Sequence, residues 1–151
     1  MQIRDCMKRN VVSLSVAATI GEAAAAFVAR HIGMLPVVNE TGHLVGLLQL
    51  RDLLSLVMPD FVRLLEDFDF VHDFGAVETR QPAPETMTRP VREVMQPPIS
   101  VDEACGLLRA AALMRRYDLH DLPIVDGDGK LVGIASRVDV ATAILAGWLA
   151  S

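Results

Sequence analysis

The sequence of 151 residues has few aromatic residues, few cysteines and no runs of basic residues. It holds five Phe, one Tyr and one Trp, so its core must consist mainly of aliphatic side chains and methionine. The two cysteines, Cys6 and Cys105, lie far apart without a partner motif, which favours small buried hydrophobes over a redox pair. With a net charge of −5 and no Lys or Arg run, the chain is not expected to bind duplex nucleic acid.

Long hydrophobic runs are missing as well. The longest uncharged stretches, 10–21 and 140–151, have twelve residues each, whereas a membrane-spanning helix needs about 20. The N-terminus becomes charged at once and lacks the apolar core of a signal peptide. We therefore expect no membrane span and a cytoplasmic location. The length fits one globular domain, since about 150 residues is a usual domain size.

The chain contains an internal repeat. Residues 35–52 and 122–139 align without a gap at an offset of 87, which superposes a Pro, two Gly and a closing Asp. Each copy has two short apolar strands around a turn of Gly, Asp and Asn, the residue types that allow positive φ in hairpins. A segment with helical spacing of apolar residues precedes each hairpin, and a short apolar strand precedes that segment. Each repeat is therefore predicted as β-α-β-β-α.

Repeats of this size, about 57 residues each, bury too little surface to be stable alone, so the two copies are expected to cover each other's sheets. The predicted organisation is repeat 1 over 1–57, an inter-repeat segment over 58–90 and repeat 2 over 91–151.

The repeated motifs resemble those of cystathionine β-synthase (CBS) domains. They comprise the opening Val-Met, the hydrophobic-Pro-hydrophobic-Val-Asp/Asn hairpin, Gly-x-hydrophobic-hydrophobic-Gly and the closing Ser/Thr-x-x-Asp. The chain is similar to a stand-alone CBS pair, or Bateman module. The resemblance implies an α+β fold in which two tandem β-α-β-β-α CBS repeats pack by pseudo-twofold symmetry into one module, and it implies a homodimer shaped as a flat disc.

The resemblance also implies a function. Such modules bind an adenosine-containing ligand (AMP, ADP, ATP, NAD or S-adenosylmethionine) between the repeats as a regulatory ligand, without a catalytic cofactor. They signal to a partner protein by conformational change. The alternative for this chain is a ligand-independent scaffold for dimerisation or interaction.

Carried over by position, Ser136 reaches phosphate and Asp139 holds the ribose hydroxyls. The residues themselves allow this chemistry, because a hydroxyl and free N–H groups at a helix start bind phosphate, and Arg137 can add a charged contact. The same Ser-x-x-Asp spacing is also an ordinary helix capping box. His120 faces phosphate or base, or is an exposed strand-edge residue, and Ile99 is an adenine wall or a core residue. The predicted ligand-binding residues are Ser136, Arg137, Asp139, His120, Asp121, Pro123, Ile99 and Ser100.

A second, degenerate site is expected in the first repeat. Asp52 matches the ribose Asp, but Gln49 stands at the hydroxyl position and is a poorer cap. The residues of this site are Asp52, Arg51, Gln49, Pro36 and Met34.

The inter-repeat segment carries seven acidic and three basic residues, which accounts for −4 of the total −5, and four of the five Phe. Phe61, Leu64, Leu65 and Phe68 have the spacing of an amphipathic helix, which packs on its own module or forms a dimer or partner surface. A metal site at Asp69, His72 and Asp73 is less favoured than a solvated acidic face, so no metal is predicted. The sequence has no P-loop and no nucleophile–base pair, and we predict that the protein is not an enzyme.

Overall fold

The computed structural model describes residues 1–57 and 81–150. The first repeat contains β1 (Leu14–Ser15), α1 (Ile20–Arg30), β2 (Met34–Val38), β3 (Leu44–Gln49) and α2 (Leu50–Leu54). The second contains β4 (Val101–Asp102), α6 (Leu107–Arg116), β5 (Asp121–Val125), β6 (Leu131–Ser136) and α7 (Arg137–Leu149). Between them lies α5 (Pro84–Met87), and each repeat begins with a 3-10 turn, η1 (Ile3–Asp5) in the first and η2 (Val91–Glu93) in the second. The predicted helix around Phe61 and the acidic Asp69–Asp73 stretch lie outside the described residues.

The two repeats have the same sheet topology. In each sheet a two-residue strand runs parallel to the first hairpin strand, and the hairpin strands are antiparallel, in the orders β1-β2-β3 and β4-β5-β6. The registers match as well, with Pro36 opposite Leu47 and Pro123 opposite Ile134. The predicted α+β fold of two tandem β-α-β-β-α repeats is confirmed, although the opening strands are shorter than the apolar segments suggested.

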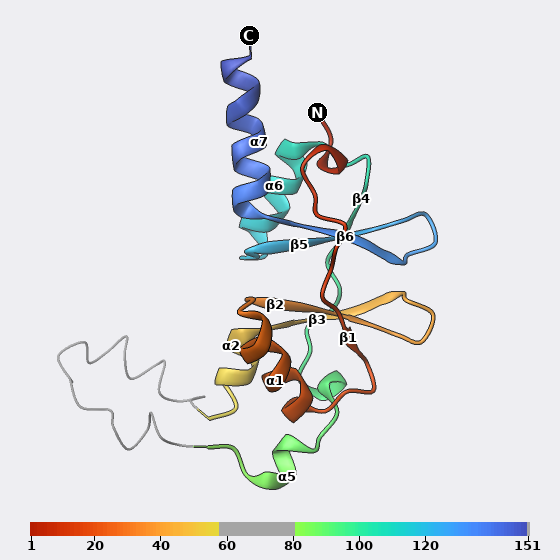
Figure 1. Ribbon diagram of the computed structural model, residues 1–151, viewed down its shortest axis with the longest axis vertical. Helices are drawn as coiled ribbons and strands as arrows, with labels where there is room; N and C mark the ends of the chain where they lie inside the picture. The colour runs from red at the N-terminus through yellow and green to blue at the C-terminus, as the bar shows by residue number, and fades with distance from the viewer. Residues whose placement is uncertain (58–80, 151) are drawn as a thin grey trace, which may run out of the picture.

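The hairpin turns have the backbone that their residues predict. Gly42 and Gly129 sit at φ of 85° and 83°, a region that glycine enters without a steric penalty. The two turns also bond to each other, since the Leu44 N–H donates to Gly129 O at 3.2 Å and the Leu131 N–H donates to Gly42 O at 3.1 Å. This reciprocal pair of bonds links the two hairpin turns, which lie on one side of the module near its middle (Figure 1).

The sheets face each other across the middle of the molecule, and helices cover their outer faces (Figure 1). Met34 and Leu47 of the first sheet belong to the same buried cluster as Leu122, Ile124 and Ala135 of the second. The strand sequences are continuous apolar runs because one face of each sheet is covered by helices and the other by the second sheet. Mutual burial of the two small repeats, as expected from their size, therefore forms one part of the core. A second buried cluster, which includes Leu35, Val37 and Leu48, lies in the first repeat and contains Val91 of the second.

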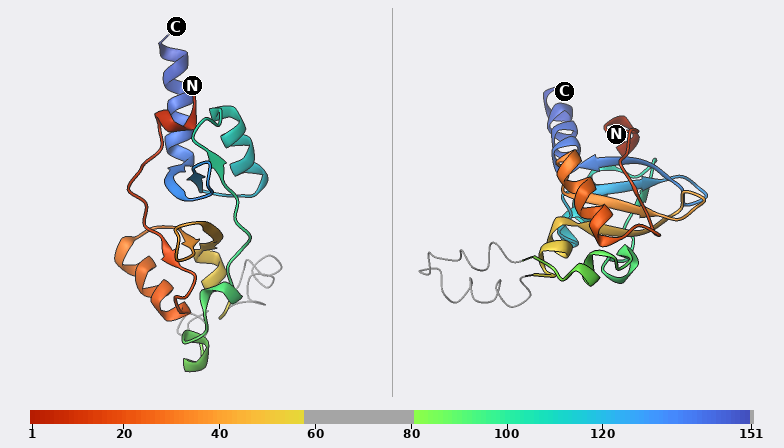
Figure 2. Two further views of the ribbon diagram at one scale, coloured as in Figure 1. Left: turned by 90° about the vertical axis from the view of Figure 1, so that its right-hand side faces the viewer. Right: turned by 60° about the horizontal axis from the view of Figure 1, so that its bottom comes forward.

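The opening segment of each repeat crosses to the other repeat, an arrangement that sequence comparison alone does not reveal. The Ile3 N–H donates to Cys105 O at 2.8 Å, and Lys8 exchanges backbone hydrogen bonds with Ile134 at 2.8 and 2.9 Å. In the same way, the Val91 N–H donates to Ala18 O at 2.9 Å. Figure 2 shows the two crossing segments on opposite sides of the module. The repeats are thus linked by exchanged segments as well as by facing sheets.

Two glycines make room for the crossing segments. A Cβ on Gly133 would lie 3.0 Å from the Met7 sulfur and 3.1 Å from the Lys8 carbonyl oxygen, and one on Gly46 would meet Met95. This contact explains why the second Gly of the repeated motif occurs in both copies. The crossing also locates the one-residue difference between the repeats, because β1 and β4 obey the offset of 87 while Met7 and Met95 are 88 apart. The extra residue lies in 9–13.

Candidate functional site

Two clefts lie where the repeats meet, and they are related by the pseudo-twofold symmetry. The Asp52 cleft has a volume of about 570 Å³ and is lined by Leu47, Gln49, Arg51, Asp52, Gln96, Pro97, Ile99, Tyr117 and Leu119. The Lys8 cleft, beside Asp139, has a volume of about 350 Å³ and is lined by Lys8, Asn10, Val12, His31, Ile32, Gly33, Met34, Asp121 and Ile134. Both volumes are in the range of small-molecule sites.

In the Asp52 cleft, a carboxylate stands beside neutral donors and apolar walls. The Gln49 N–H donates to Asp52 Oδ2 at 2.8 Å, and the Gln96 side-chain amide donates to Oδ1 at 3.2 Å. Leu47 and the fully covered Leu119 supply apolar surface, together with Ile99. A carboxylate held at the start of a helix can accept two neighbouring hydroxyl groups, as a ribose presents them. The apolar walls suit a flat heterocycle.

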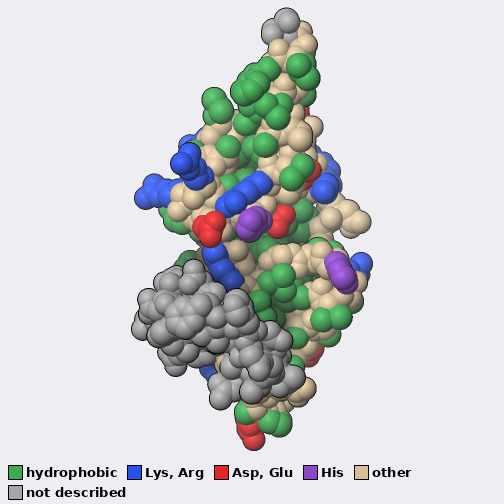
Figure 3. Space-filling model, turned by 90° about the vertical axis from the view of Figure 1, so that its left-hand side faces the viewer, with side chains coloured by type: hydrophobic (Ala, Val, Ile, Leu, Met, Phe, Trp, Pro, Cys, Tyr) green, Lys and Arg blue, Asp and Glu red, His purple; other side chains and the backbone are tan. Residues whose placement is uncertain are grey.

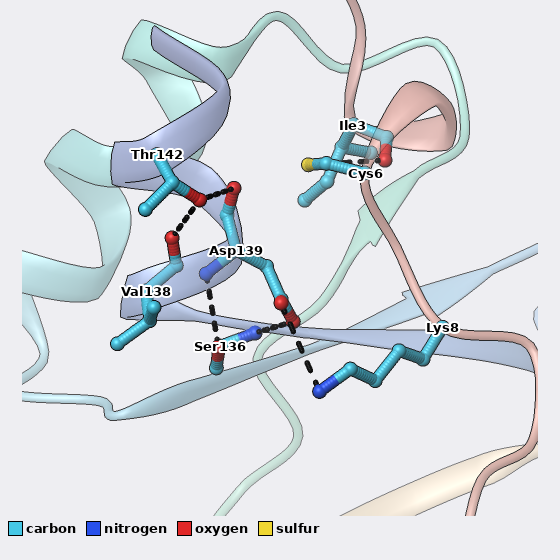
Figure 4. A network of polar contacts seen from close by, with 7 residues as sticks. All are labelled: Ile3, Cys6, Lys8, Ser136, Val138, Asp139 and Thr142. Carbon is cyan, nitrogen blue, oxygen red and sulfur yellow. Dashed lines mark hydrogen bonds and ion pairs between the residues drawn. The ribbon is translucent and has the colours of Figure 1, made fainter. Parts of the chain in front are cut away.

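Asp139 has the same local geometry but a different neighbour. The Ser136 N–H donates to Asp139 Oδ2 at 2.9 Å, and the Asp139 N–H donates to Ser136 Oγ at 3.0 Å. The capping interpretation of Ser-x-x-Asp is therefore confirmed, while a role in ligand binding stays a prediction. Lys8 reaches in from the crossing segment, with Nζ 3.8 Å from Asp139 Oδ1 (Figure 4). The position of Lys8 corresponds to that of Gln96, so a cation replaces a neutral amide.

Charge also differs between the clefts. Burial raises the pKa of the half-buried Asp121 in the Lys8 cleft, and the nearby Asp139 carboxylate raises it further, while His120 and Lys8 act in the opposite direction. At the mouth of the Asp52 cleft, hydrogen bonds from Arg137 and Arg51 lower the pKa of Asp118. The Asp52 cleft thus has arginines at its mouth, whereas the Lys8 cleft combines one lysine with a carboxylate that is costly to ionise.

The structure brings together only part of each predicted site. Asp52, Arg51 and Gln49 share the Asp52 cleft as expected, but Ile99 lies with them and not with Asp139. Met34, assigned to the first-repeat site, lines the Lys8 cleft with Asp121 of the second. Both differences follow from the crossing, because each cleft takes its walls from both repeats.

Other predicted residues stand apart from the clefts. Pro36 and Pro123 are buried within β2 and β5. Ser100 lines a separate hollow with Asp102 and Arg109. The His120 side chain is exposed, and its carbonyl oxygen accepts the Arg137 N–H at 2.9 Å. The strand-edge interpretation of His120 therefore fits its position.

Sequence reasoning missed several lining residues. Lys8 and Val12 enter the Lys8 cleft, and Gln96, Tyr117 and Leu119 enter the Asp52 cleft. The alignment of Met7 with Met95 already paired Lys8 with Gln96 as equivalent positions. What it lacked was the crossing, which alone places each of them opposite the closing Asp of the other repeat.

Within residues 1–57 and 81–150, no group of three or more His, Cys, Asp or Glu side chains is placed to hold a metal ion. Across the same residues, no helix has both the length and the apolar character needed to cross a bilayer. The cytoplasmic location stays a prediction.

Comparison with known proteins shows a family match and two similar relatives. The model of the CBS domain family matches residues 3–59 and 91–146. CBSX1, a chloroplastic CBS domain-containing protein of Arabidopsis thaliana, is 34% identical over 134 residues, which cover 84% of this chain and 56% of CBSX1. The uncharacterised protein MJ1404 of Methanocaldococcus jannaschii is 31% identical over 140 residues, which cover 92% of this chain. The chain spans only 31% of the length of MJ1404.

Solved structures agree with this comparison. The crystal structure of CBSX2 in complex with AMP, from the same plant, has a TM-score of 0.72 at 27% identity, with 96% of each chain covered. The family match falls on the two halves that share one topology, and its two copies together cover most of the sequence. The chain therefore belongs to the CBS domain family and contains two tandem CBS repeats.

Proposed function

We propose that the chain is a regulatory module without catalysis of its own, which binds an adenosine-containing ligand between its CBS repeats. Binding changes the relation between the repeats and is signalled to a partner protein. The observation that carries the proposal is the Asp52 cleft. There the Asp52 carboxylate, held by the Gln49 N–H at the start of α2, and apolar side chains from both repeats border one cavity of about 570 Å³. The similarity to CBSX2, whose crystal structure contains AMP, supports the same ligand class.

We assign the adenosine group first to the Asp52 cleft. There the outer oxygen of the carboxylate meets a neutral amide, which a ribose hydroxyl displaces at the cost of one ordinary hydrogen bond. In the Lys8 cleft a ligand must displace the Lys8 ammonium from Asp139, and the cavity is smaller, about 350 Å³. The Lys8 cleft, beside Asp139, is then a second and weaker site. This order reverses the one that Gln49 suggests from sequence alone.

A thermal unfolding experiment tests the proposal. Wild type, Asp52→Asn and Asp139→Asn are melted with AMP, ADP, ATP, NAD and S-adenosylmethionine, and Glu40→Gln at an exposed hairpin position is the control. A ligand at about 100 times its Kd adds about 2.7 kcal/mol, which raises the melting temperature by about 5 to 10 °C. We expect the shift in wild type, in the control and in Asp139→Asn, and its loss in Asp52→Asn. No shift with any of the five compounds overturns the proposal.

We further propose that the module forms a homodimer through α6 and α7. A groove of about 320 Å³ runs between these helices, lined by Ala111, Met114, Val140 and Ile144 among others. Large side chains around it are exposed to solvent, Leu108 by 76%, Val138 by 69% and Leu145 by 45%. Hydrophobic side chains gather along α7 on this face (Figure 3). An apolar surface of this kind is typical of a protein–protein contact.

Sedimentation analysis measures this association. Leu108→Gln with Leu145→Gln is expected to weaken the dimer at least tenfold, since each buried leucine contributes about 1.5–3 kcal/mol. Thr41→Gln on the distant hairpin is the control. A monomeric wild type at all concentrations contradicts the dimer. A ligand-independent scaffold is the second candidate function, favoured by this same surface, and it is indicated if the dimer forms while none of the five compounds binds.

A further inference from the structure

Arginines from the two repeats meet on one carboxylate at the mouth of the Asp52 cleft. Arg51 Nη1 lies 2.9 Å from Asp118 Oδ2, and Arg137 Nη2 lies 3.1 Å from Asp118 Oδ1, so each oxygen holds one guanidinium. Arg137 is fixed further by its Nε, which donates to Leu119 O at 2.6 Å. Figure 3 shows charged side chains of both signs gathered at the waist between the two halves of this face.

One of these arginines lines the cleft, and the other, Arg137, lines the neighbouring groove between α6 and α7 and reaches the cleft mouth through its contact with Asp118. Arg51 lines the cleft itself, and so do Tyr117 and Leu119, the chain neighbours of Asp118 on either side. A ligand that places its adenosine group against Asp52 therefore also meets Arg51, the preceding residue of α2, which lines the same cleft. Two guanidinium groups around one point form a site for an anion with several oxygens, such as phosphate.

The fold does not require a carboxylate at position 118. The residue follows α6 with a left-handed backbone, φ of 52°, and the equivalent residue after α1 is His31, also at φ of 52°. A His therefore meets the backbone requirement in the other repeat. Moreover, the side chains are open to water, 70% for Asp118 and 53% for Arg51, so the contact is exchangeable.

We propose that Asp118 is a built-in competitor for the phosphate group, which determines how strongly the Asp52 cleft prefers phosphate-bearing over phosphate-free adenosine ligands. The inference rests on the proposed function and specifies the ligand class of that cleft. When a phosphorylated ligand binds, its phosphate takes the place of the Asp118 carboxylate on Arg51 and Arg137. Adenosine leaves the Asp118 contacts in place. In the Lys8 cleft the residue at the position equivalent to Asp118 is His31, which carries no carboxylate.

Calorimetric titration of AMP and adenosine into wild type, Asp118→Asn and Arg51→Gln tests the proposal. Asn keeps the left-handed backbone and the shape of Asp but removes the negative charge that holds both arginines. We expect Asp118→Asn to bind AMP about two- to fivefold more tightly, the range of an exposed ion pair, and adenosine unchanged. Arg51→Gln is expected to lose most of the preference for AMP. Asp128→Asn, on the exposed hairpin turn, is the control.

The outcomes separate this inference from the proposed function. If both ligands bind and Asp118→Asn leaves the ratio of the two affinities as in wild type, the role of Asp118 is overturned while the ligand site stands. If neither ligand binds any variant, the role of Asp118 is overturned, and the proposed function is overturned with it only when ADP, ATP, NAD and S-adenosylmethionine also leave the melting temperature unchanged. Added salt supplies a further check, because the gain of Asp118→Asn is expected to shrink from 50 to about 500 mM salt.

Discussion

Replacing Ile3 by Ala tests the crossing of the N-terminal segment onto the second repeat. Ile3 is the third residue of the chain, yet its side chain is completely buried, in the cluster that includes Cys105, Leu107 and Ile124. An Ile→Ala change at such a site removes apolar contacts and leaves a cavity, which costs about 2–5 kcal/mol. For a protein of this size, the loss corresponds to a fall of about 4 to 20 °C in melting temperature.

Urea unfolding followed by circular dichroism gives the free energy of unfolding for each variant. Val91→Ala, at the equivalent buried position of the second crossing segment, is expected to lose somewhat less, because valine is smaller. Val28→Ala is the control, since that side chain is 75% exposed and its removal is expected to cost under about 0.5 kcal/mol. A change as small as this control for Ile3→Ala would refute the crossing, because an N-terminal segment that merely lies on the surface loses little.

Further changes test other parts of the account. Gly133→Ala is expected to lower the free energy of unfolding by about 1–3 kcal/mol, because the new methyl group meets the Lys8 carbonyl at 3.1 Å. Gly127→Ala is the control, since the space around Gly127 is open. An equal loss in both variants contradicts the close approach. Ser136→Ala is expected to cost about 0.5–2 kcal/mol in urea unfolding through loss of the α7 cap, and no loss contradicts the capping role. Because burial raises the pKa of Asp121 in the folded protein, stability falls as pH rises through that pKa. Asp121→Asn is therefore expected to stabilise the protein at pH 7 and to lose this gain below about pH 4, and an equal gain at both pH values contradicts the assignment.

Local features of the fold were predictable because each rests on a short stretch of sequence. The Gly in each hairpin turn predicts a positive φ, and Gly42 and Gly129 have it. The helical spacing of Leu107, Ala110, Ala111 and Met114 predicts one buried face. Ala111 is partly buried, and the other three side chains are buried. The repeat itself predicts two copies of one topology, which is confirmed. These features depend on local propensity and on which faces must be covered.

Which residues line which cleft was not predictable, because this depends on contacts between distant parts of the chain. Nothing in the sequence around Lys8 shows that this residue lies opposite Asp139 rather than within its own repeat. For the same reason Ile99 was grouped with Asp139, while the structure places it with Asp52. Asp118 carries no motif at all, and its importance appears only when Arg51 and Arg137 are seen to meet on it. The exchange of opening segments therefore explains why Ile99 and Met34 line other clefts than the sequence predicts.

A crystal structure of the protein grown with saturating AMP tests the central claim most directly. We predict AMP in the Asp52 cleft, with its ribose hydroxyls on the Asp52 carboxylate and its base between Ile99 and Leu119. The phosphate is predicted to lie on Arg51. Electron density for AMP only outside the clefts between the repeats, or none at saturating concentration, would contradict the account.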